Sequence, residues 1–170
     1  PVIYDESLAT KSQEVIEQAV KNMGYMRADV SLEKKTKKKK IKLNYRIKTD
    51  KLYQVSHIAY HIDDIHIQEI IDKDSTNSYL HTGMPFNIVT LDAERQRITK
   101  LLQQHGYYKF NKDFLVYQAD TVRNTFKVEI TLKLLPYQRK KEDIPTKHQA
   151  YKIRNINFIE ENNIIHYNNE

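Results

Sequence analysis

The sequence has 170 residues and a formal net charge of +6, and it contains neither cysteine nor tryptophan. The absence of cysteine excludes disulfides, thiolate nucleophiles and cysteine-based zinc sites, and three glycines leave little material for a phosphate-binding loop. Six of the 28 Lys and Arg residues lie in the stretch 34–40, and the other 22 balance the 22 Asp and Glu, so the basicity is a local feature.

The sequence carries no sign of a membrane-spanning or signal segment. No apolar run approaches the roughly 20 residues that a bilayer-spanning helix needs, and no charged start is followed by an apolar stretch. The sequence begins at Pro1 instead of a methionine. We therefore expect it to be a piece of a longer protein, whose signal sequence or membrane anchor would lie outside these residues.

The first expected element is a helix over 5–23, where apolar residues recur at helical spacing. Asp5 or Ser7 is a suitable N-cap for its free N–H groups. Gly24 follows as a stop, because glycine accepts the left-handed conformation at a helix C-terminus.

The apolar period then changes to two, which predicts a pair of strands over 26–33 and 41–48 with one buried face each. The lysine-rich stretch between them is expected to form the hairpin tip. A third strand is expected over 52–62, with Ile58, Tyr60 and Ile62 on one face, and a short helix over 63–72.

A second long helix is expected from about Val89 to His105, with Asn87 or Thr90 as its cap and Gly106 as its stop. Its apolar stripe comprises Leu91, Ile98, Leu101 and Leu102. A second strand pair is then expected over 107–118 and 125–135, again with alternating apolar residues.

This order is an internal repeat. A shift of 82 positions aligns the two long helices and places Gly24–Tyr25 on Gly106–Tyr107 without a gap. Four further residues in the second hairpin bring its last strand into line at an offset of 86, and AYKIRNINFI (150–159) matches LYQVSHIAYHI (52–62).

The repeat unit is therefore strand, helix, helix, strand, strand. Residues 1–50 hold the second half of one repeat, and 51–136 hold a complete repeat. Residues 137–149 are an expected linker and hinge, since few apolar side chains there could dock on a core, and 150–170 supply the first strand and short helix of a further repeat.

The repeat resembles the polypeptide-transport-associated (POTRA) domains of outer-membrane protein assembly factors. The resemblance rests on HTGMPFNIVTLDAERQRITKLLQQHGYY (81–108), which joins Gly-x-Pro-Phe to a helix with spaced leucines and then to Gly-Tyr, and on the strands YQVSHIAY and YKIRNINF. It covers nearly the whole chain. The glycine that family members often carry after the first strand is Asp63 here and Glu161 in the next copy.

The resemblance implies an α+β fold of tandem repeats, each a three-stranded mixed sheet covered by two helices. It implies a periplasmic array at the outer membrane, attached to a C-terminal membrane barrel of the parent chain, with no cofactor and no enzymatic activity. The implied partners are unfolded outer-membrane proteins or other transported polypeptides, together with accessory assembly subunits.

By the same resemblance, an extended client would add as a strand to the open sheet edge after Gly-Tyr, through backbone hydrogen bonds. In the complete repeat the residues of this predicted edge are Asp113, Phe114, Leu115, Val116 and Tyr117. The incomplete first repeat and the extra strand at the end of the chain further suggest strand-swapped self-association.

The lysine cluster admits two interpretations; its members are Lys34, Lys35, Lys37, Lys38, Lys39 and Lys40. Contact with an anionic lipid surface would be worth about 1 kcal/mol per lysine. A solvated hairpin tip is the interpretation we favour at this point, because like charges in a turn repel and often serve solubility.

A basic nucleic-acid-binding module is the alternative function, using the lysine cluster and stacking on aromatic residues. A strong salt dependence of RNA or DNA binding would distinguish it. We expect no nucleic-acid partner, because most aromatic residues on strands fall at core-facing positions, including Tyr45, Tyr60, Phe126 and Phe158.

No catalytic or metal site is expected. Of His57, His61 and His66, the first two share a strand face but lie about 13 Å apart at 3.3 Å per residue, too far for one ion. The adjacent carboxylates Asp63–Asp64 and Glu160–Glu161 point to opposite faces of an extended chain, so neither pair converges on a substrate.

Overall fold

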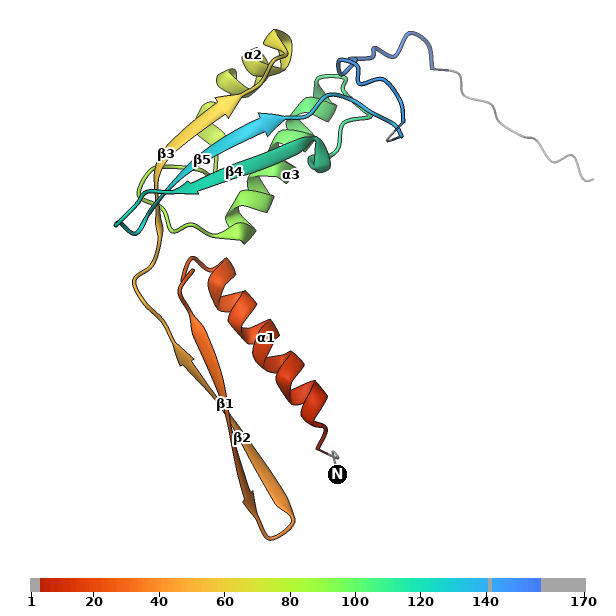
Figure 1. Cartoon of the computed structure of the whole chain (residues 1–170). Helices are drawn as coiled ribbons and strands as arrows, with labels where there is room; N and C mark the ends of the chain where they lie inside the picture. The colour runs from red at the N-terminus through yellow and green to blue at the C-terminus, as the bar shows by residue number, and fades with distance from the viewer. Residues whose placement is uncertain (1–3, 141, 157–170) are drawn as a thin grey trace, which may run out of the picture.

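The computed structural model describes residues 4–140 and 142–156 (Figure 1). The first part of the chain contains helix α1 (Glu6–Asn22) and strands β1 (Asp29–Lys37) and β2 (Lys40–Lys48). The second part contains β3 (Gln54–His61), α2 (Ile65–Lys73), η1 (Ser75–Asn77), α3 (Ile88–Gln104), η2 (Lys112–Phe114), β4 (Leu115–Thr121) and β5 (Lys127–Leu134), where η denotes a 3-10 turn. None of the described helices is long and apolar enough to cross a bilayer.

Helix α1 lies along the β1–β2 hairpin and buries only a narrow face against it (Figure 1). As predicted, the Asp5 carboxylate caps the helix, accepting hydrogen bonds from the N–H groups of Ser7 (2.8 Å) and Leu8 (3.2 Å). Ala9 is buried, and its carbonyl accepts a hydrogen bond from the Tyr45 hydroxyl at 3.2 Å. The predicted apolar stripe of this helix is otherwise largely exposed, at Leu8, Val15 and Met23.

The complete copy is built on a three-stranded sheet with the order β3-β5-β4. The central strand β5 pairs in parallel with β3 and antiparallel with β4. Helices α2 and α3 cover one face of this sheet, where Val128, Ile130 and Leu132 are fully buried (Figure 1). Lys127 and Glu129 are exposed on the other face. The predicted α+β fold, a mixed sheet under two helices, is therefore confirmed.

Two clusters of buried apolar side chains fill the space between the sheet and the helices. The first comprises Tyr53, Val55, Leu80, Met84, Phe86, Leu91, Val128 and Ile130. The second comprises Ile67, Ile71, Ile98, Leu102, Tyr107, Phe110, Leu115 and Leu132. Tyr117 of β4 packs against both clusters. The edge strand is therefore joined to the whole core of the copy.

A β-bulge in β3 changes which side chains face the core. Val55 is buried, but after the register shift at Ser56 it is Ile58 and Tyr60 that pack on the clusters. The predicted inward face with Ile58, Tyr60 and Ile62 is confirmed. Strict alternation of side chains along the strand would have placed Val55 on the other face from Ile58, whereas the bulge lets both face the core.

A turn follows the Gly-Tyr pair in both copies, where the sequence predicts strand. The Ala28 N–H donates to the Tyr25 carbonyl at 2.8 Å, and the Phe110 N–H donates to the Tyr107 carbonyl at the same distance. Strands β1 and β4 therefore begin later than the alternation of apolar residues predicts.

The pairing registers correct the offset between the two hairpins. The first buried residue of β1 is Val30 and that of β4 is Leu115, an offset of 85 from 30 to 115. Their cross-strand partners are Ile47 and Leu134, an offset of 87 from 47 to 134. The sequence-based offset of 86 for the last strand is wrong by one residue, which would place every side chain of that strand on the wrong face.

The segment 137–149 folds back on itself and contacts the rest of the chain through His148. Tyr137 and Thr146 form an isolated antiparallel bridge with two backbone hydrogen bonds of 2.8 and 2.9 Å. His148 is buried, with its ring centre 4.7 Å from that of Phe114. The expectation that little in this segment could dock on a core is wrong at His148, because its imidazole packs edge-on against an aromatic ring.

The β1–β2 hairpin closes through a two-residue loop, Lys38 and Lys39, and both residues have positive φ (44° and 63°). Such a loop favours Asn-Gly, because lysine in the left-handed region costs roughly 1 kcal/mol. The double variant Lys38→Asn/Lys39→Gly should stabilise the hairpin by about 1 kcal/mol, slowing amide hydrogen exchange in β1 and β2 about fivefold.

The matched control for this variant is Lys38→Gln/Lys39→Gln, which removes the same two charges but keeps both Cβ atoms. Equal protection of the hairpin amides in both variants would show that charge repulsion, and not the backbone conformation, is the destabilising factor.

Candidate functional site

Strand β4 is an edge of its sheet, and within the described residues no strand pairs with its outer side. Just before β4 the Leu135 N–H donates to the Phe114 carbonyl (2.8 Å), and just after it the Val122 N–H donates to the Lys127 carbonyl (3.0 Å). Hydrogen-bonded pairs alternate in an antiparallel ladder, so the even-numbered residues of β4 bond to β5. The residues whose N–H and C=O groups point outward are therefore Leu115, Tyr117, Ala119 and Thr121.

The predicted edge residues fall in two environments. Asp113 and Phe114 belong to the turn η2, which corrects their assignment to the strand, whereas Leu115, Val116 and Tyr117 lie in β4. The backbone of Val116 faces β5, so only two of the five predicted residues offer outward groups. The prediction missed the outward positions in the second half of the strand, Ala119 and Thr121, because it began the strand too early.

The other sheet edge, β3, is covered at its start by the segment 83–86. The Val55 N–H donates to the Met84 carbonyl (2.9 Å), and the Gly83 N–H donates to the Val55 carbonyl (2.7 Å). Gln54 and Pro85 form an isolated bridge in the same place. Unused backbone groups are therefore available along the whole outer side of β4 but only beyond this segment on β3.

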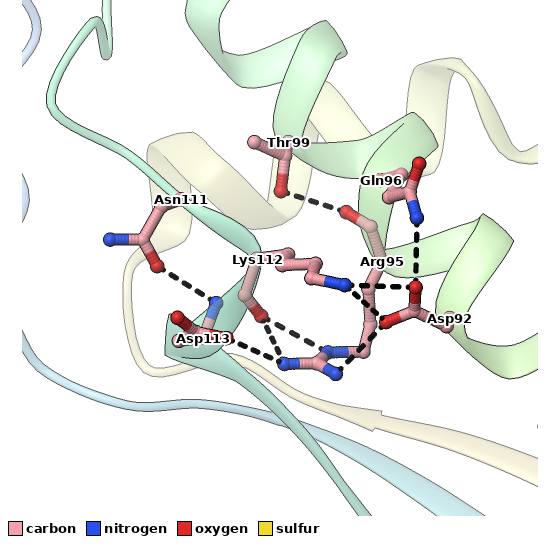
Figure 2. A network of polar contacts seen from close by, with 7 residues as sticks. All are labelled: Asp92, Arg95, Gln96, Thr99, Asn111, Lys112 and Asp113. Atoms are coloured by element: carbon pink, nitrogen blue, oxygen red, sulfur yellow. Dashed lines mark hydrogen bonds and ion pairs between the residues drawn. The ribbon is translucent and has the colours of Figure 1, made fainter.

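Figure 2 shows a network of polar side chains that fastens η2, and with it the start of β4, to helix α3. The Arg95 guanidinium donates to the Lys112 carbonyl from Nε (3.0 Å) and Nη2 (2.7 Å), and to Asp92 from Nη1 (3.2 Å). Lys112 Nζ also lies 2.9 Å from both carboxylate oxygens of Asp92. Asp92 also accepts a hydrogen bond from Gln96 at 2.8 Å.

The network keeps its charges at neutral pH. The hydrogen bond from Lys112, followed by that from Gln96, holds the pKa of Asp92 below its usual value. The carboxylate therefore stays ionised and continues to accept from α3 and η2 together. A pre-ordered edge loses less conformational entropy when it binds an extended segment, which favours binding at β4.

The hydroxyl of Tyr117 is buried and has no hydrogen-bond partner among the described residues. Burial raises the pKa of Tyr117 well above its usual range, so the phenol stays protonated at any physiological pH. The ring fixes the inner face of β4 to the core, while the outer backbone groups of the same residue remain unused.

Glu94 on α3 is a buried carboxylate that sequence reasoning missed. It accepts hydrogen bonds from Ser78 Oγ (2.9 Å), from the Tyr79 N–H (3.0 Å), and from Arg97 Nη2 (2.7 Å) and Nε (2.8 Å). Arg97 also forms an ion pair with Asp74. These contacts fix the loop after α2 to α3. The position of Glu94 could have indicated its burial, because Glu94 lies on the helical stripe between the buried Leu91 and Ile98.

The Glu94 contacts predict an acid-sensitive part of the fold. Burial alone raises the pKa of Glu94, but the hydrogen bonds from Arg97, Tyr79 and Ser78 together outweigh it and hold the pKa below the ordinary 4.5. The folded pKa is thus below the unfolded one, so the stabilisation is present above about pH 4.5 and is lost as the pH falls through the folded value.

The variant Glu94→Gln should lower the free energy of unfolding by about 3 kcal/mol at neutral pH, because one amide oxygen cannot accept all four bonds. It should also weaken the loss of stability below pH 4.5. Urea denaturation at neutral and acid pH measures both effects. Glu69→Gln, exposed on α2, is the control; an equal loss in both variants would contradict a role for the buried carboxylate.

The glycine of each Gly-Tyr pair accepts a backbone hydrogen bond from a tyrosine further along the chain. The Tyr53 N–H donates to the Gly24 carbonyl (2.9 Å), and the Tyr151 N–H donates to the Gly106 carbonyl (2.8 Å). Both glycines have positive φ, 102° and 93°. A Cβ at Gly24 would lie 2.7 Å from the Phe86 carbonyl oxygen, and one at Gly106 would lie 2.6 Å from the Tyr151 carbonyl oxygen. Sequence reasoning identified these glycines as helix stops and as landmarks of the repeat, but not as positions of close backbone approach.

The chain offers a matched test of this close approach. Gly83 also has positive φ (86°), but a Cβ there would meet nothing within 4 Å. Gly83→Ala should therefore cost only the backbone strain, about 1 kcal/mol. Gly24→Ala and Gly106→Ala should cost more in urea denaturation, and Gly106→Ala should shift the amide resonance of Tyr151. Equal costs at all three positions would rule out a role for the approaching backbone.

The six predicted lysines do not form one group. The Lys34 ammonium lies 4.1 Å from the centre of the Tyr4 ring, on the face of the hairpin that carries Tyr45 toward α1. Lys38 and Lys39 form the turn. The remaining members, Lys35, Lys37 and Lys40, lie on the opposite face.

The histidines and carboxylates that the sequence singled out do not converge. Among the described residues, no group of three or more His, Asp or Glu could hold a metal ion. His61 Nε2 lies 3.5 Å from Asp63, and Asp64 caps α2 by accepting from the N–H groups of His66 and Ile67. Phe158 and the Glu160–Glu161 pair lie outside the described residues.

Comparison with known proteins gives structural matches only. No protein-family model and no curated protein matches the chain. The structure is similar to that of BamA from Haemophilus ducreyi lacking POTRA domains 1-3, with 18% identity, a TM-score of 0.47, and coverage of 78% of this chain and 23% of that one. It is similar to Haemophilus influenzae BamA POTRA3-5, with 13% identity, a TM-score of 0.48, and coverage of 75% and 49%.

A third similar structure is POTRA1-3 of the periplasmic domain of Omp85 from Anabaena, with 14% identity, a TM-score of 0.37, and coverage of 75% of this chain and 49% of that one. The chain thus spans from 23% to 49% of the solved chains that it matches. At these identities and TM-scores the similarity concerns the fold and carries no argument about function.

Proposed function

We propose that the chain is a periplasmic scaffold region of an outer-membrane protein assembly factor, and that it binds extended segments of unfolded outer-membrane proteins by strand addition at β4. The observation that carries this proposal is the unpaired outer edge of β4, with outward backbone groups at Leu115, Tyr117, Ala119 and Thr121. The repeated strand, helix, helix, strand, strand order and the resemblance in sequence support the family.

Strand addition suits a protein that handles many clients. Backbone N–H and C=O groups are the same in every polypeptide, so the edge can bind segments of different sequence. Four outward residues offer up to eight hydrogen-bonding groups, enough for a segment about as long as β4 itself. Accessory assembly subunits that carry an exposed strand would bind the same edge.

A hollow lies beside the start of β4 and the end of β5. It has a volume of about 410 Å³, and its lining residues are Asn111, Asp113, Phe114, Leu135, Pro136 and Gln138. The apolar members, Phe114, Leu135 and Pro136, would accept one apolar side chain of a client that runs beyond Leu115. The predicted edge residues Asp113 and Phe114 thus keep a role in the proposal, as part of the hollow.

The proposed organisation is an array of repeats. Residues 1–50 are the second half of one repeat, 51–136 a complete repeat, 137–149 a connecting segment and 150–170 the start of a further repeat. The two hydrogen bonds from Tyr53 to Gly24 and from Tyr151 to Gly106 support the first and last of these boundaries. Each joins the end of one long helix to the second residue that the repeat assigns to the next strand.

An NMR titration with an extended peptide tests the proposal. A peptide of about ten residues with alternating apolar and polar side chains, the length of a membrane β-strand, is added to the labelled chain. Amide shifts should concentrate on β4 and η2. Ala119→Pro, which removes one outward N–H but no bond to β5, should weaken binding at least tenfold.

Ala119→Ser is the matched control, because it keeps the N–H and should bind as the parent does. A second control is the same peptide with every backbone nitrogen methylated, which removes the donors of both strand edges and should not bind even if the proline variant is disturbed. Shifts confined to other surfaces, or binding of the methylated peptide with unchanged affinity, would show that β4 is not the site.

A further inference from the structure

The β1–β2 hairpin places lysines directly opposite one another. In its register Lys35 pairs with Lys42, and Lys37 pairs with Lys40. Cross-strand partners share a face of the hairpin, and so do residues two apart along a strand. The four ammonium groups therefore extend from one face, on positions about 7 Å apart along each strand and about 5 Å apart across it.

This lysine face, defined by Lys35, Lys37, Lys40 and Lys42, is not neutralised within the described residues. None of its four ammonium groups takes part in an ion pair there. The nearest acidic residue on the same face, Glu33, already pairs with Arg46 at 2.8 Å. The face therefore presents a concentrated positive charge to solvent.

Repulsion between the opposed lysines destabilises the hairpin. Like charges directly opposite one another destabilise a strand pair. The loop adds a second cost, because Lys38 and Lys39 occupy the left-handed region, where Asn and Gly are favoured. A hairpin tip selected only for solubility has no need of opposed lysines, whereas a binding surface for anions does.

The position of the hairpin makes the lysine face accessible. The β1–β2 ribbon extends away from the three-stranded sheet, and its tip projects past the start of α1 (Figure 1). Lys35, Lys37, Lys40 and Lys42 are all exposed. The opposite face of the ribbon is the one that packs on α1, through Val30 and Tyr45.

We propose that the lysine face and the two turn lysines bind the anionic headgroups of a lipid surface. A membrane is favoured over a nucleic acid because no aromatic residue shares this face to stack on a base. The basic groups at the tip are also all lysines, which act as point charges toward phosphate and lack the bidentate fork of arginine. This inference goes beyond strand addition at β4 and does not depend on it.

Vesicle sedimentation tests the inference with the complete chain. The chain should bind vesicles of phosphatidylcholine mixed with phosphatidylglycerol, and not vesicles of phosphatidylcholine alone. Replacing all four residues of the lysine face by Gln should lower the partition coefficient at least tenfold, and added salt should weaken binding further. The substitutions relieve repulsion in the hairpin, so loss of folding is not expected.

The matched control replaces four exposed lysines that lie elsewhere and form no ion pair, at Lys11, Lys73, Lys100 and Lys127. It has the same net charge as the test variant and should bind vesicles nearly as the parent does. Equal losses in both variants, or no binding of the parent to anionic vesicles, would overturn the inference. Binding of a single-stranded oligonucleotide with the same dependence on the lysine face would replace the lipid by a nucleic acid.

Peptide binding at β4 should be unchanged in the lysine-face variant. This separates the two proposals, because either can fail in these measurements while the other holds.

Discussion

The arrangement depends on the backbone hydrogen bond that the glycine of each Gly-Tyr pair accepts from a tyrosine further along the chain. Gly24 ends α1 in the left-handed region and offers its carbonyl to Tyr53, which begins the chain path into β3. The same bond recurs between Gly106 and Tyr151. A Cβ has no room at either glycine, so backbone approaches backbone directly: the Phe86 carbonyl lies against Gly24, and the Tyr151 carbonyl lies against Gly106.

The candidate binding edge is a consequence of how the rest of the copy satisfies its polar groups. Helix α3 uses one polar network, around Arg95 and Asp92, to hold the start of β4, and another, around Glu94, to hold the loop after α2. The start of β3 is covered by the segment 83–86. Unused backbone hydrogen-bonding groups therefore extend along the whole outer side of β4 but only along the later part of β3.

The periodicity of the sequence was sufficient for the two long helices and the alternating strands, and the resemblance to POTRA domains supplied the mixed sheet under two helices. The sequence was insufficient where a single residue shifts the register or the start of a strand. Ser56 inserts a bulge, η2 delays β4, and the hairpins differ by one residue from the best sequence alignment. The edge was predicted in the right element but over a range displaced toward its start. Glu94 and His148 were missed because their burial depends on partners distant in the chain.

The offsets between the two hairpins also indicate how a repeat of this kind can change length. The added residues lie in the turn before β4 and in the loop before β5, and none lies inside a ladder. An odd insertion within a strand would exchange its inner and outer faces, whereas a turn absorbs it locally. The two hairpins therefore differ in their turns, where a change of length leaves the buried faces of the strands unchanged. Such turns are also where a reporter peptide can be spliced into the copy without altering which residues are buried.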